Sequence, residues 1–286
     1  MILVTGATGY LGTSVIDHLV KHSGSQAFAA LARSETKAAP LKNRGVEVRI
    51  GDFDQIETLC EAFVGVDKLL LISTMESRRL EQHINVIDTA KKAGVKHVFY
   101  TGLAIRDITT SNVRELMQSH FQTEDYLRKS GLKYTFLRNS MYADAIPLIV
   151  GEAVLEHGIY LPGGNGKVPY VLRREMGEVA ARALLSEGHE NKIYNISGSR
   201  AYSYAEVAAQ ISQLSGKSLS YVDANHEEFI EKMKASGMDD FMIYLLGGTV
   251  SDIKAHQYDV PESDLFNLLG RESLSLAEML KELYRF

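Results

Sequence analysis

The chain has 286 residues, 45% of them hydrophobic, and a formal net charge of −5. This size allows one large domain, or one and a half, with a sizeable core, and the absence of a basic block disfavours nucleic-acid binding. No apolar stretch approaches the ~20 residues of a bilayer-spanning helix, and isolated basic pairs predict solvated surface: Arg78–Arg79, Lys91–Lys92 and Arg173–Arg174.

The first predicted element is a short apolar strand, residues 2–4, which runs into the turn GATGYLG and then into a helix. Within a β-α-β unit each glycine of this turn has a physical role. Gly6 permits the tight turn, Gly9 lets the backbone approach a pyrophosphate, and Gly12 lets the helix pack close to the sheet. The helix N-terminus offers free N–H groups to the anion. The predicted phosphate-binding residues are Gly6, Ala7, Thr8, Gly9, Tyr10, Leu11 and Gly12.

The second predicted strand, residues 27–33, ends in Arg33, where a dinucleotide-binding fold reads the adenosine ribose. An acidic residue there would bond the 2′-hydroxyl and select NAD. A guanidinium instead suits a 2′-phosphate through charge-assisted hydrogen bonds. Arg33 therefore favours NADP(H), although a surface arginine at a strand end is the alternative. Ser34 could assist a phosphate, whereas Glu35 would oppose one if it pointed inward.

Four more strands are expected over residues 46–52, 68–74, 97–102 and 134–139, with helices over 56–63, 80–93 and about 120–130. Continuous apolar strands alternating with helices predict an α/β, Rossmann-type, doubly wound parallel sheet. Ligands bind at the strand ends of such sheets, so the further cofactor candidates are Asp52, Phe53, Ser73, Thr74 and Gly102. For Asp52, a helix cap by it or by Asp54 is an equal alternative.

After residue 140 the predicted elements become shorter. Two strand-like pieces flank a glycine-rich turn within residues 158–171, a helix covers 173–185, and a strand covers 192–197. Ser203 with Glu206, and Asn225 with Glu228, have capping-box spacing. We expect a NAD(P)-binding domain over residues 1–140, and over 141–286 mainly a substrate lobe with some segments returning to the sheet. A glycine pair at 247–248 would permit a hinge.

Several motifs resemble the NmrA-like, atypical short-chain dehydrogenase/reductase family, in particular its type 2 bacterial quinone oxidoreductases and triphenylmethane dye reductases. They are VTGATGYLG, HVFYTG, YTFLRNSMY and GHENKIYN, and the resemblance covers most of the chain. It implies an NADPH-binding Rossmann domain and a small C-terminal lobe, with the substrate in the cleft between them.

The sequence departs from the pattern of typical short-chain dehydrogenases, in which a lysine lowers the pKa of a tyrosine four residues before it. Many NmrA-like relatives keep only the lysine, ten residues before a Ser-Gly pair. Counting back ten residues from Ser130 places His120 at the lysine position and Leu116 at the tyrosine position. The missing acid/base couple disfavours epimerase, dehydratase and alcohol dehydrogenase chemistry. Hydride transfer from NADPH to a quinone or similar planar, dye-like electrophile needs mainly proximity and orientation. A non-catalytic NADP(H)-binding redox sensor is the alternative, since it also lacks the couple.

Three residues are candidates for the catalytic end of the site. His120 could bond the nicotinamide ribose or donate a proton to a reduced quinone oxygen, although a partly buried helix histidine is an equal alternative. Asn139 could position a carbonyl, and Tyr142 could stack on a flat acceptor or pack in the lobe. Tyr170 or Phe241 could line the acceptor pocket.

The remaining reactive side chains predict no further chemistry. One cysteine, Cys60, excludes an internal disulfide and favours a reducing, cytoplasmic compartment. It lies between Glu57 and Glu61, so we expect it to pack in the core rather than react. Histidines such as His157 and His189 show no metal-ligand spacing, so no metal is expected. The oligomeric state and the identity of the acceptor stay open.

Overall fold

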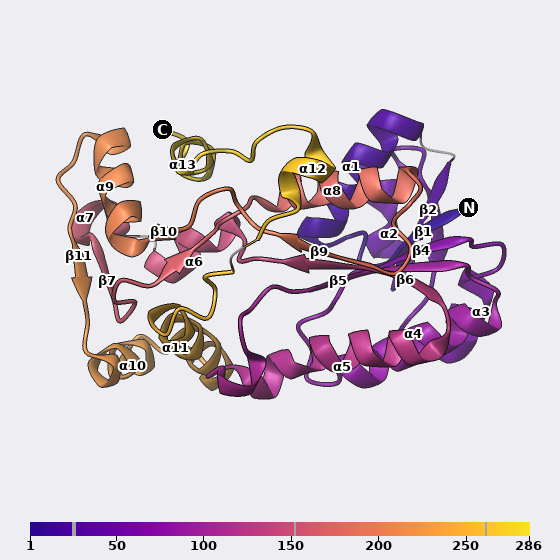
Figure 1. The fold of residues 1–286 in the computed structure, drawn as a ribbon, viewed down its shortest axis with the longest axis horizontal. Helices are drawn as coiled ribbons and strands as arrows, with labels where there is room; N and C mark the ends of the chain where they lie inside the picture. Colours follow the sequence, from indigo (N-terminus) through magenta and orange to yellow (C-terminus); the bar gives the residue numbers. More distant parts are fainter. Residues whose placement is uncertain (25–26, 152, 261) are drawn as a thin grey trace.

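The computed structural model describes residues 1–24, 27–151, 153–260 and 262–286, and a seven-stranded parallel sheet forms its centre (Figure 1). The strand order is β3-β2-β1-β4-β5-β6-β9, and it reverses between β1 and β4, as in a doubly wound sheet. The predicted Rossmann-type fold is thus confirmed. The strands are β1 Ile2–Val4, β2 Phe28–Ala32, β3 Glu47–Ile50, β4 Lys68–Leu71, β5 His97–Leu103, β6 Lys133–Asn139 and β9 Lys192–Ile196.

Helices cover both faces of the sheet, which explains why its central strands are apolar at nearly every position. One face carries α1 (Tyr10–Ser23), α8 (Arg173–Leu185) and α12 (Leu265–Leu269), and the other carries α3 (Ile56–Ala62), α4 (Arg79–Lys92) and α5 (Arg114–Ser130). The remaining helix of this half, α2, spans Glu35–Lys42. Each face has its own cluster of buried hydrophobic side chains.

Helix α8 comes from the second half of the chain and packs directly on α1. A glycine at the crossing makes this possible. A Cβ atom on Gly177 would lie 2.5 Å from the Cβ of Ser14, well inside van der Waals contact. The first helix of the glycine turn is therefore held between the sheet and a helix that the chain supplies about 160 residues later.

The rest of the second half forms a lobe beside the carboxyl ends of the strands, with its own hydrophobic core. The two pieces around the glycine-rich turn do not pair with each other as neighbours. Instead β7 (Ile159–Leu161) pairs with β11 (Tyr221–Asp223), and β8 (Lys167–Val168) pairs with β10 (Tyr202–Ser203). The lobe helices are α6 Ile146–Val150, α7 Val154–His157, α9 Tyr204–Ser215, α10 His226–Ala235, α11 Asp240–Lys254 and α13 Leu276–Tyr284, and the short 3-10 turns are η1 Ile108–Thr110 and η2 Ala143–Ala145.

The helix starts follow the predicted capping chemistry. Ser203 and Glu206 form a complete capping box at α9. Asn225 caps α10 by accepting hydrogen bonds from the amides of Glu227 and Glu228, but the Glu228 side chain does not complete the predicted capping box. Helix α5 begins at Arg114, six residues before the predicted start at His120. The prediction started late because polar residues on the exposed face weaken the apolar pattern of the first turns. The domain boundary at residue 140 stays a prediction.

Two expectations were wrong. Cys60 is exposed, because the buried side of α3 consists of Leu59 and Ala62. Gly247 and Gly248 lie inside α11 rather than in a hinge. Added Cβ atoms there would meet side-chain atoms of α10 and of the segment before α5 at 2.6 and 2.7 Å, so both glycines serve close packing.

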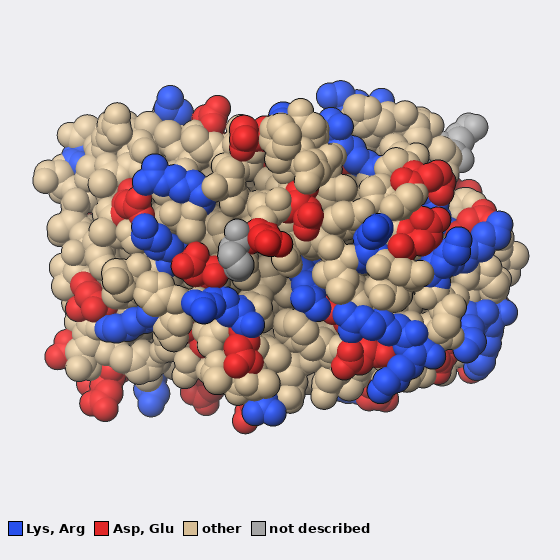
Figure 2. Space-filling model, viewed as in Figure 1, with Lys and Arg blue, Asp and Glu red and all other residues tan. Residues whose placement is uncertain are grey.

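None of the helices in the described ranges combines the length and apolar character that crossing a bilayer requires. Acidic and basic side chains are interspersed over the face shown in Figure 2, without a broad field of one sign.

Candidate cofactor and acceptor site

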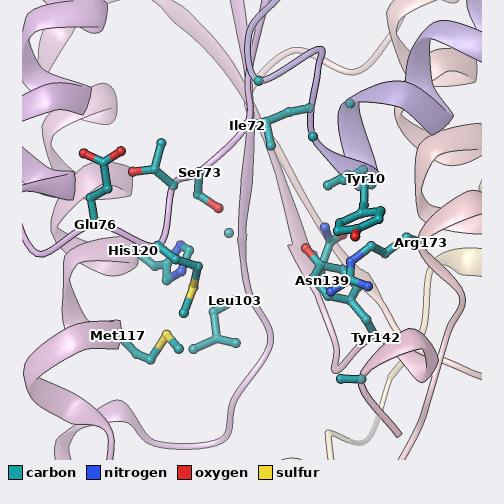
Figure 3. A pocket seen from close by; sticks show the side chains of 18 of the residues that line it. Tyr10, Ile72, Ser73, Glu76, Leu103, Met117, His120, Asn139, Tyr142 and Arg173 are labelled. Atoms are coloured by element: carbon teal, nitrogen blue, oxygen red, sulfur yellow. The ribbon is translucent and has the colours of Figure 1, made fainter. Parts of the chain in front are cut away.

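A cavity of about 810 Å³ lies at the carboxyl ends of the strands, between the sheet and the lobe. Each of the first six strands contributes a residue at or just beyond its end: Gly6, Arg33, Gly51, Ile72, Leu103 and Ser140. Figure 3 shows the middle of this cavity, with Tyr10, Arg173, Tyr142 and Asn139 along one wall and Glu76, Ser73, His120 and Met117 along the other.

The glycine turn forms the cavity wall after β1. Gly6 has φ +60°, a backbone conformation that favours glycine, and its carbonyl accepts a hydrogen bond from the amide of Gly9 at 3.0 Å. Gly9 is the N-cap of α1 and supplies no side-chain cap, so the first amides of the helix are directed at the cavity. Thr8, Tyr10 and Leu11 line the cavity, whereas Ala7 is buried in the core beneath the turn.

The second and third glycines of the turn have different surroundings. A Cβ atom on Gly12 would lie 2.1 Å from the carbonyl oxygen of Gly6 and 2.7 Å from the Cα of Ala7, so the fold itself requires this glycine. A Cβ atom on Gly9 would meet only the Gly6 oxygen, at an ordinary 3.4 Å. The fold tolerates a side chain at Gly9, and the glycine keeps space open on the cavity side. This arrangement fits a pyrophosphate.

Two cations lie where β2 leaves the sheet. Arg33 has a side chain 59% exposed, and its Nη1 lies 3.4 Å from Glu76 Oε1. Lys37, one turn into α2, also lines the cavity. The hydroxyl of Ser34 accepts a hydrogen bond from the Lys37 amide and so caps α2, and Glu35 pairs with Lys42 rather than pointing inward. This charge arrangement fits a 2′-phosphate.

Asp52 and Phe53 line the cavity after β3. The Asp52 carboxylate accepts a hydrogen bond from the amide of Asp54 at 2.9 Å. Helix α3 starts after Gln55, which makes no side-chain cap, so the alternative in which Asp52 or Asp54 caps this helix is not the one found. The Phe53 carbonyl accepts a hydrogen bond from Asn85 Nδ2 at 2.9 Å, which ties the loop to α4.

The loop after β4 is held in place by side chains of β5 and α4. Strand β4 ends at Leu71, earlier than predicted, so Ser73 and Thr74 lie in the loop and line the cavity. The Ser73 amide donates to Thr101 Oγ1 at 2.9 Å, and the Thr74 hydroxyl donates to Gln82 at 3.3 Å. Gly102 lines the cavity beside them.

His120 lines the cavity from α5 and is otherwise buried. Its Nδ1 lies 2.8 Å from the hydroxyl of Tyr100, which fixes the ring. Burial, and then the positive charge of Arg79, hold the pKa of His120 well below its ordinary value. The imidazole is therefore neutral near pH 7. The neutral ring can donate one hydrogen bond or accept one, but it cannot act as a cationic acid.

Asn139 and Tyr142 line the opposite wall, at and beyond the end of β6. The guanidinium of Arg173 lies 4.4 Å from the centroid of the Tyr142 ring and 5.5 Å from that of Tyr10, so it sits between the two rings. Burial raises the pKa of Tyr142, so its hydroxyl stays protonated.

The lobe end of the cavity is apolar and rich in methionine. Phe241, 45% exposed, lines it as predicted, but Tyr170 does not, because its ring is buried in the lobe core beside Tyr204. Leu103, the last residue of β5, and Met117 of α5 face the cavity (Figure 3). The other apolar lining residues here are Met141, Ala145, Leu148, Ile149, Met242, Leu245 and Leu246.

The profile of the NmrA-like family matches residues 1–257. Quinone oxidoreductase 2 of Escherichia coli (strain K12) is 36% identical over 287 residues, which cover 99% of both chains.

The chain belongs to the NmrA-like family.

A further relative and two crystal structures are similar to this chain over most of their length. The NAD(P)H azoreductase of Xenophilus azovorans is 35% identical over 84% of this chain and 82% of its own. The crystal structure of the E. coli NADPH-dependent quinone oxidoreductase QOR2 with NADPH superposes with a TM-score of 0.93 at 35% identity, covering 99% and 100% of the two chains. The Citrobacter sp. triphenylmethane reductase complexed with NADP(H) gives 0.90 at 35% identity, with 99% of each chain covered.

Sequence reasoning missed three cations around this NmrA-like cavity. Lys37 lies in the first turn of α2, a helix that was not among the predicted elements. Arg79 and Arg173 each belong to a pair predicted to lie on the surface. Instead Arg79 is fully buried, and Arg173 lines the cavity.

No group of three or more histidine, cysteine, aspartate or glutamate side chains is placed to hold a metal ion within the ranges that the structure describes. His189 bonds the hydroxyls of Tyr194 and Ser186.

A second histidine behind the cavity predicts acid sensitivity. His83 is fully buried, its Nδ1 lies 2.9 Å from Thr123 Oγ1, and burial lowers its pKa from 6.5 to about 3. Below about pH 6.5 the unfolded chain binds a proton at His83 that the folded chain does not bind. The free energy of unfolding therefore falls as the pH falls toward 3. At about pH 5 the loss is about 2 kcal/mol. Urea unfolding at about pH 7.5 and 5 should therefore show a pH-dependent loss that is about 2 kcal/mol smaller in His83→Gln.

The matched control is His157→Gln, since the His157 side chain is 78% exposed. An acid loss in His83→Gln equal to that of the unmodified protein would contradict the neutral, buried state of His83.

Proposed function

We propose that this protein is an NADPH-dependent reductase that transfers hydride to a quinone or a similar planar, dye-like electrophile. The observation that carries the proposal is one continuous cavity with two unlike ends. One end has the glycine turn, a helix N-terminus and two cations; the other is apolar and open to a flat ring. The names of the relatives, quinone oxidoreductase, azoreductase and triphenylmethane reductase, support the same class of acceptor.

The residues of the cavity divide between cofactor and acceptor. The turn from Gly6 to Gly12 would hold the pyrophosphate, and Arg33 with Lys37 the 2′-phosphate. The residues that would border the nicotinamide half are Ser73, Thr74, Gly102, His120 and Asn139. When bound, NADPH supplies the hydride.

The protein then contributes position and a sheltered environment rather than a strong acid. His120 is neutral, and Tyr100 holds its ring, so it orients a polar group by hydrogen bonding. Tyr142 and Met117 border the space for the acceptor ring. An electrophilic acceptor needs no proton before hydride arrives, and water supplies the proton afterwards.

The proposal includes a small-molecule acceptor as the partner and a reducing, cytoplasmic location. The free thiol of Cys60 is compatible with that location.

The test is the oxidation of NADPH by the purified protein, followed by its absorbance, with a panel of quinones and azo dyes. We expect oxidation that depends on both protein and acceptor. Tight NADPH binding without oxidation by any acceptor would refute the reductase and favour the redox sensor.

Replacing Arg33 with alanine should weaken NADPH binding by about tenfold or more, the value of one charge-assisted hydrogen bond, and change NADH binding little. Lys37→Ala should act in the same direction. The control is Arg44→Ala, since Arg44 pairs with Asp17 outside the cavity lining. Both dissociation constants can be measured by fluorescence titration. Equal losses for the two cofactors would remove Arg33 from the 2′-phosphate.

A further inference from the structure

Arg79 is a buried cation for which the described residues provide no ionic partner. Its side chain is fully buried, and no carboxylate of these residues forms an ion pair with it. Its Nε donates to the carbonyl of Thr74, its Nη1 donates to the carbonyl of Leu116 at 3.2 Å and to Ser119 Oγ at 3.0 Å, and its Nη2 reaches only the sulfur of Met75 at 3.6 Å. Burying an unpaired charge costs folding free energy.

The hydrogen bonds of Arg79 join two walls of the cavity. Thr74 and Met75 belong to the loop after β4, and Leu116 and Ser119 flank Met117 on α5. Thr74, Met75, Met117 and His120 all line the cavity. The guanidinium therefore lies directly behind the wall that the nicotinamide and the acceptor would face.

The charge of Arg79 reaches the cavity. An arginine stays protonated in proteins, even though burial lowers the pKa of Arg79 from its high ordinary value. After burial, the charge of Arg79 is the next cause that lowers the pKa of both His83 and His120. It also acts to lower the pKa of Tyr142 on the opposite wall, but there it is weaker than burial, the hydrogen bond of Asn139 and the charge of Arg173. The charge of Arg79 therefore acts mainly on the cavity wall that carries His120.

Among the described residues, few carboxylates offset the charge of Arg79 at the lobe end of the cavity. The carboxylates that line the cavity are Asp52 and Glu76, and Glu76 is near Arg33 and accepts from Gln82. Asp252, a buried carboxylate of the lobe, is outside the lining and accepts three hydrogen bonds from Ser111 and Asn112. Arg173 adds a second cation, partly balanced by Asp144 at 3.7 Å.

Hydride transfer changes the charge at this place. The acceptor gains a hydrogen nucleus with two electrons, so a neutral quinone becomes a hydroquinone monoanion and the oxidised cofactor ring gains the matching positive charge. A proton from water then neutralises the monoanion. A fixed positive charge beside the acceptor favours the anion more than the neutral quinone, which is the condition for accelerating the step.

We propose that the buried guanidinium of Arg79 stabilises the negative charge that arises on the acceptor and makes the site select neutral or anionic planar acceptors against cationic ones. This narrows the reductase proposal, because it disfavours cationic triphenylmethane dyes among the dye-like acceptors, and it rests on that proposal for the turnover step. The charge preference can also be measured without any reaction.

The first experiment uses two redox-inert probes with the same ring system, a naphthalene sulfonate and a naphthyl trimethylammonium, and measures their dissociation constants by calorimetry. At an effective dielectric constant of about 20, two charges about 10 Å apart change an affinity roughly tenfold. We expect the unmodified protein to bind the sulfonate at least about tenfold more tightly than the ammonium. In Arg79→Met the ratio should fall by about tenfold or more, and Arg79→Lys should keep most of it.

The neighbouring arginine provides the matched control. Arg78 carries the same charge one residue earlier, but it is exposed and pairs with Asp54 and Glu81. Arg78→Met should change the probe ratio less than about twofold, because solvent screens that charge. Arg79→Gln replaces the methionine variant if that variant does not fold.

The second experiment measures turnover of a neutral naphthoquinone. Arg79→Met should lower kcat about tenfold and leave KM nearly unchanged, since the charge arises only on reduction. A probe ratio near one in the unmodified protein, or a ratio that Arg79→Met and Arg79→Gln leave unchanged, overturns the proposal. Absence of turnover in the unmodified protein overturns the reductase instead, while the probe ratio still decides the charge preference.

Discussion

Replacing Gly9 with valine is expected to abolish NADPH binding while the protein stays folded. Gly9 has φ −86° and ψ 172°, which any residue adopts, and an added Cβ would make only an ordinary 3.4 Å contact with the Gly6 carbonyl. The branched side chain would instead fill the space in front of the first turn of α1, where the pyrophosphate would lie. A loss of affinity of at least about a hundredfold is expected, since several backbone hydrogen bonds to a charged group fail together.

The measurement is a fluorescence titration with NADPH, accompanied by a thermal unfolding curve. The midpoint of unfolding without cofactor should shift by only a few degrees, as for a substitution that makes no clash. Gly9→Ala should lie between the two proteins in affinity. If the valine variant kept its affinity for NADPH, the turn would be only a structural element.

Replacing Gly12 with alanine is expected to do the opposite and damage the fold. The new Cβ would lie 2.1 Å from the Gly6 carbonyl oxygen and 2.7 Å from the Cα of Ala7. Both neighbours are backbone in a turn fixed between β1 and α1, so neither moves without disturbing the sheet. Overpacking a core commonly costs 1–3 kcal/mol, and a backbone clash belongs at or above about 3 kcal/mol. Urea unfolding in the absence of cofactor measures this loss directly.

The two variants separate the two roles of the turn. Gly12→Ala should lose stability whether or not NADPH is present, and Gly9→Val should lose only the stabilisation that NADPH adds. A Gly12→Ala protein as stable as the unmodified one would show that α1 can move away from the turn.

The fold could be read largely from the sequence because its signals are local. Strands buried on both faces are continuous apolar runs, and β2 and β5 stand out for that reason. The pairing partners of the short lobe strands could not be read in this way. β7 pairs with β11, about 60 residues later, and nothing in two or three residues of strand specifies so distant a partner.

The cofactor half of the site was also predictable, since a glycine turn after a strand is a local pattern. The buried cation was not, because Arg79 follows Arg78 and a charged pair is normally solvated. A signal was present nonetheless. Arg79 lies on the buried side of its own helix. It precedes other buried positions at helical spacings: Gln82, His83, Val86, Ile87 and Ala90.

Helix α8 packs on α1 through Gly177, and β9 pairs with β6, so the sheet layer includes segments from the second half of the chain. The chain leaves the lobe to complete the sheet layer, re-enters the lobe, and returns once more for α12 before its final helix. A chimera that grafts the acceptor end of one relative onto the nucleotide half of another therefore needs several junctions rather than one. A single cut near residue 140 would remove α8 from the surface of α1. It would also remove β9, leaving β6 as an unpaired edge strand prone to aggregation.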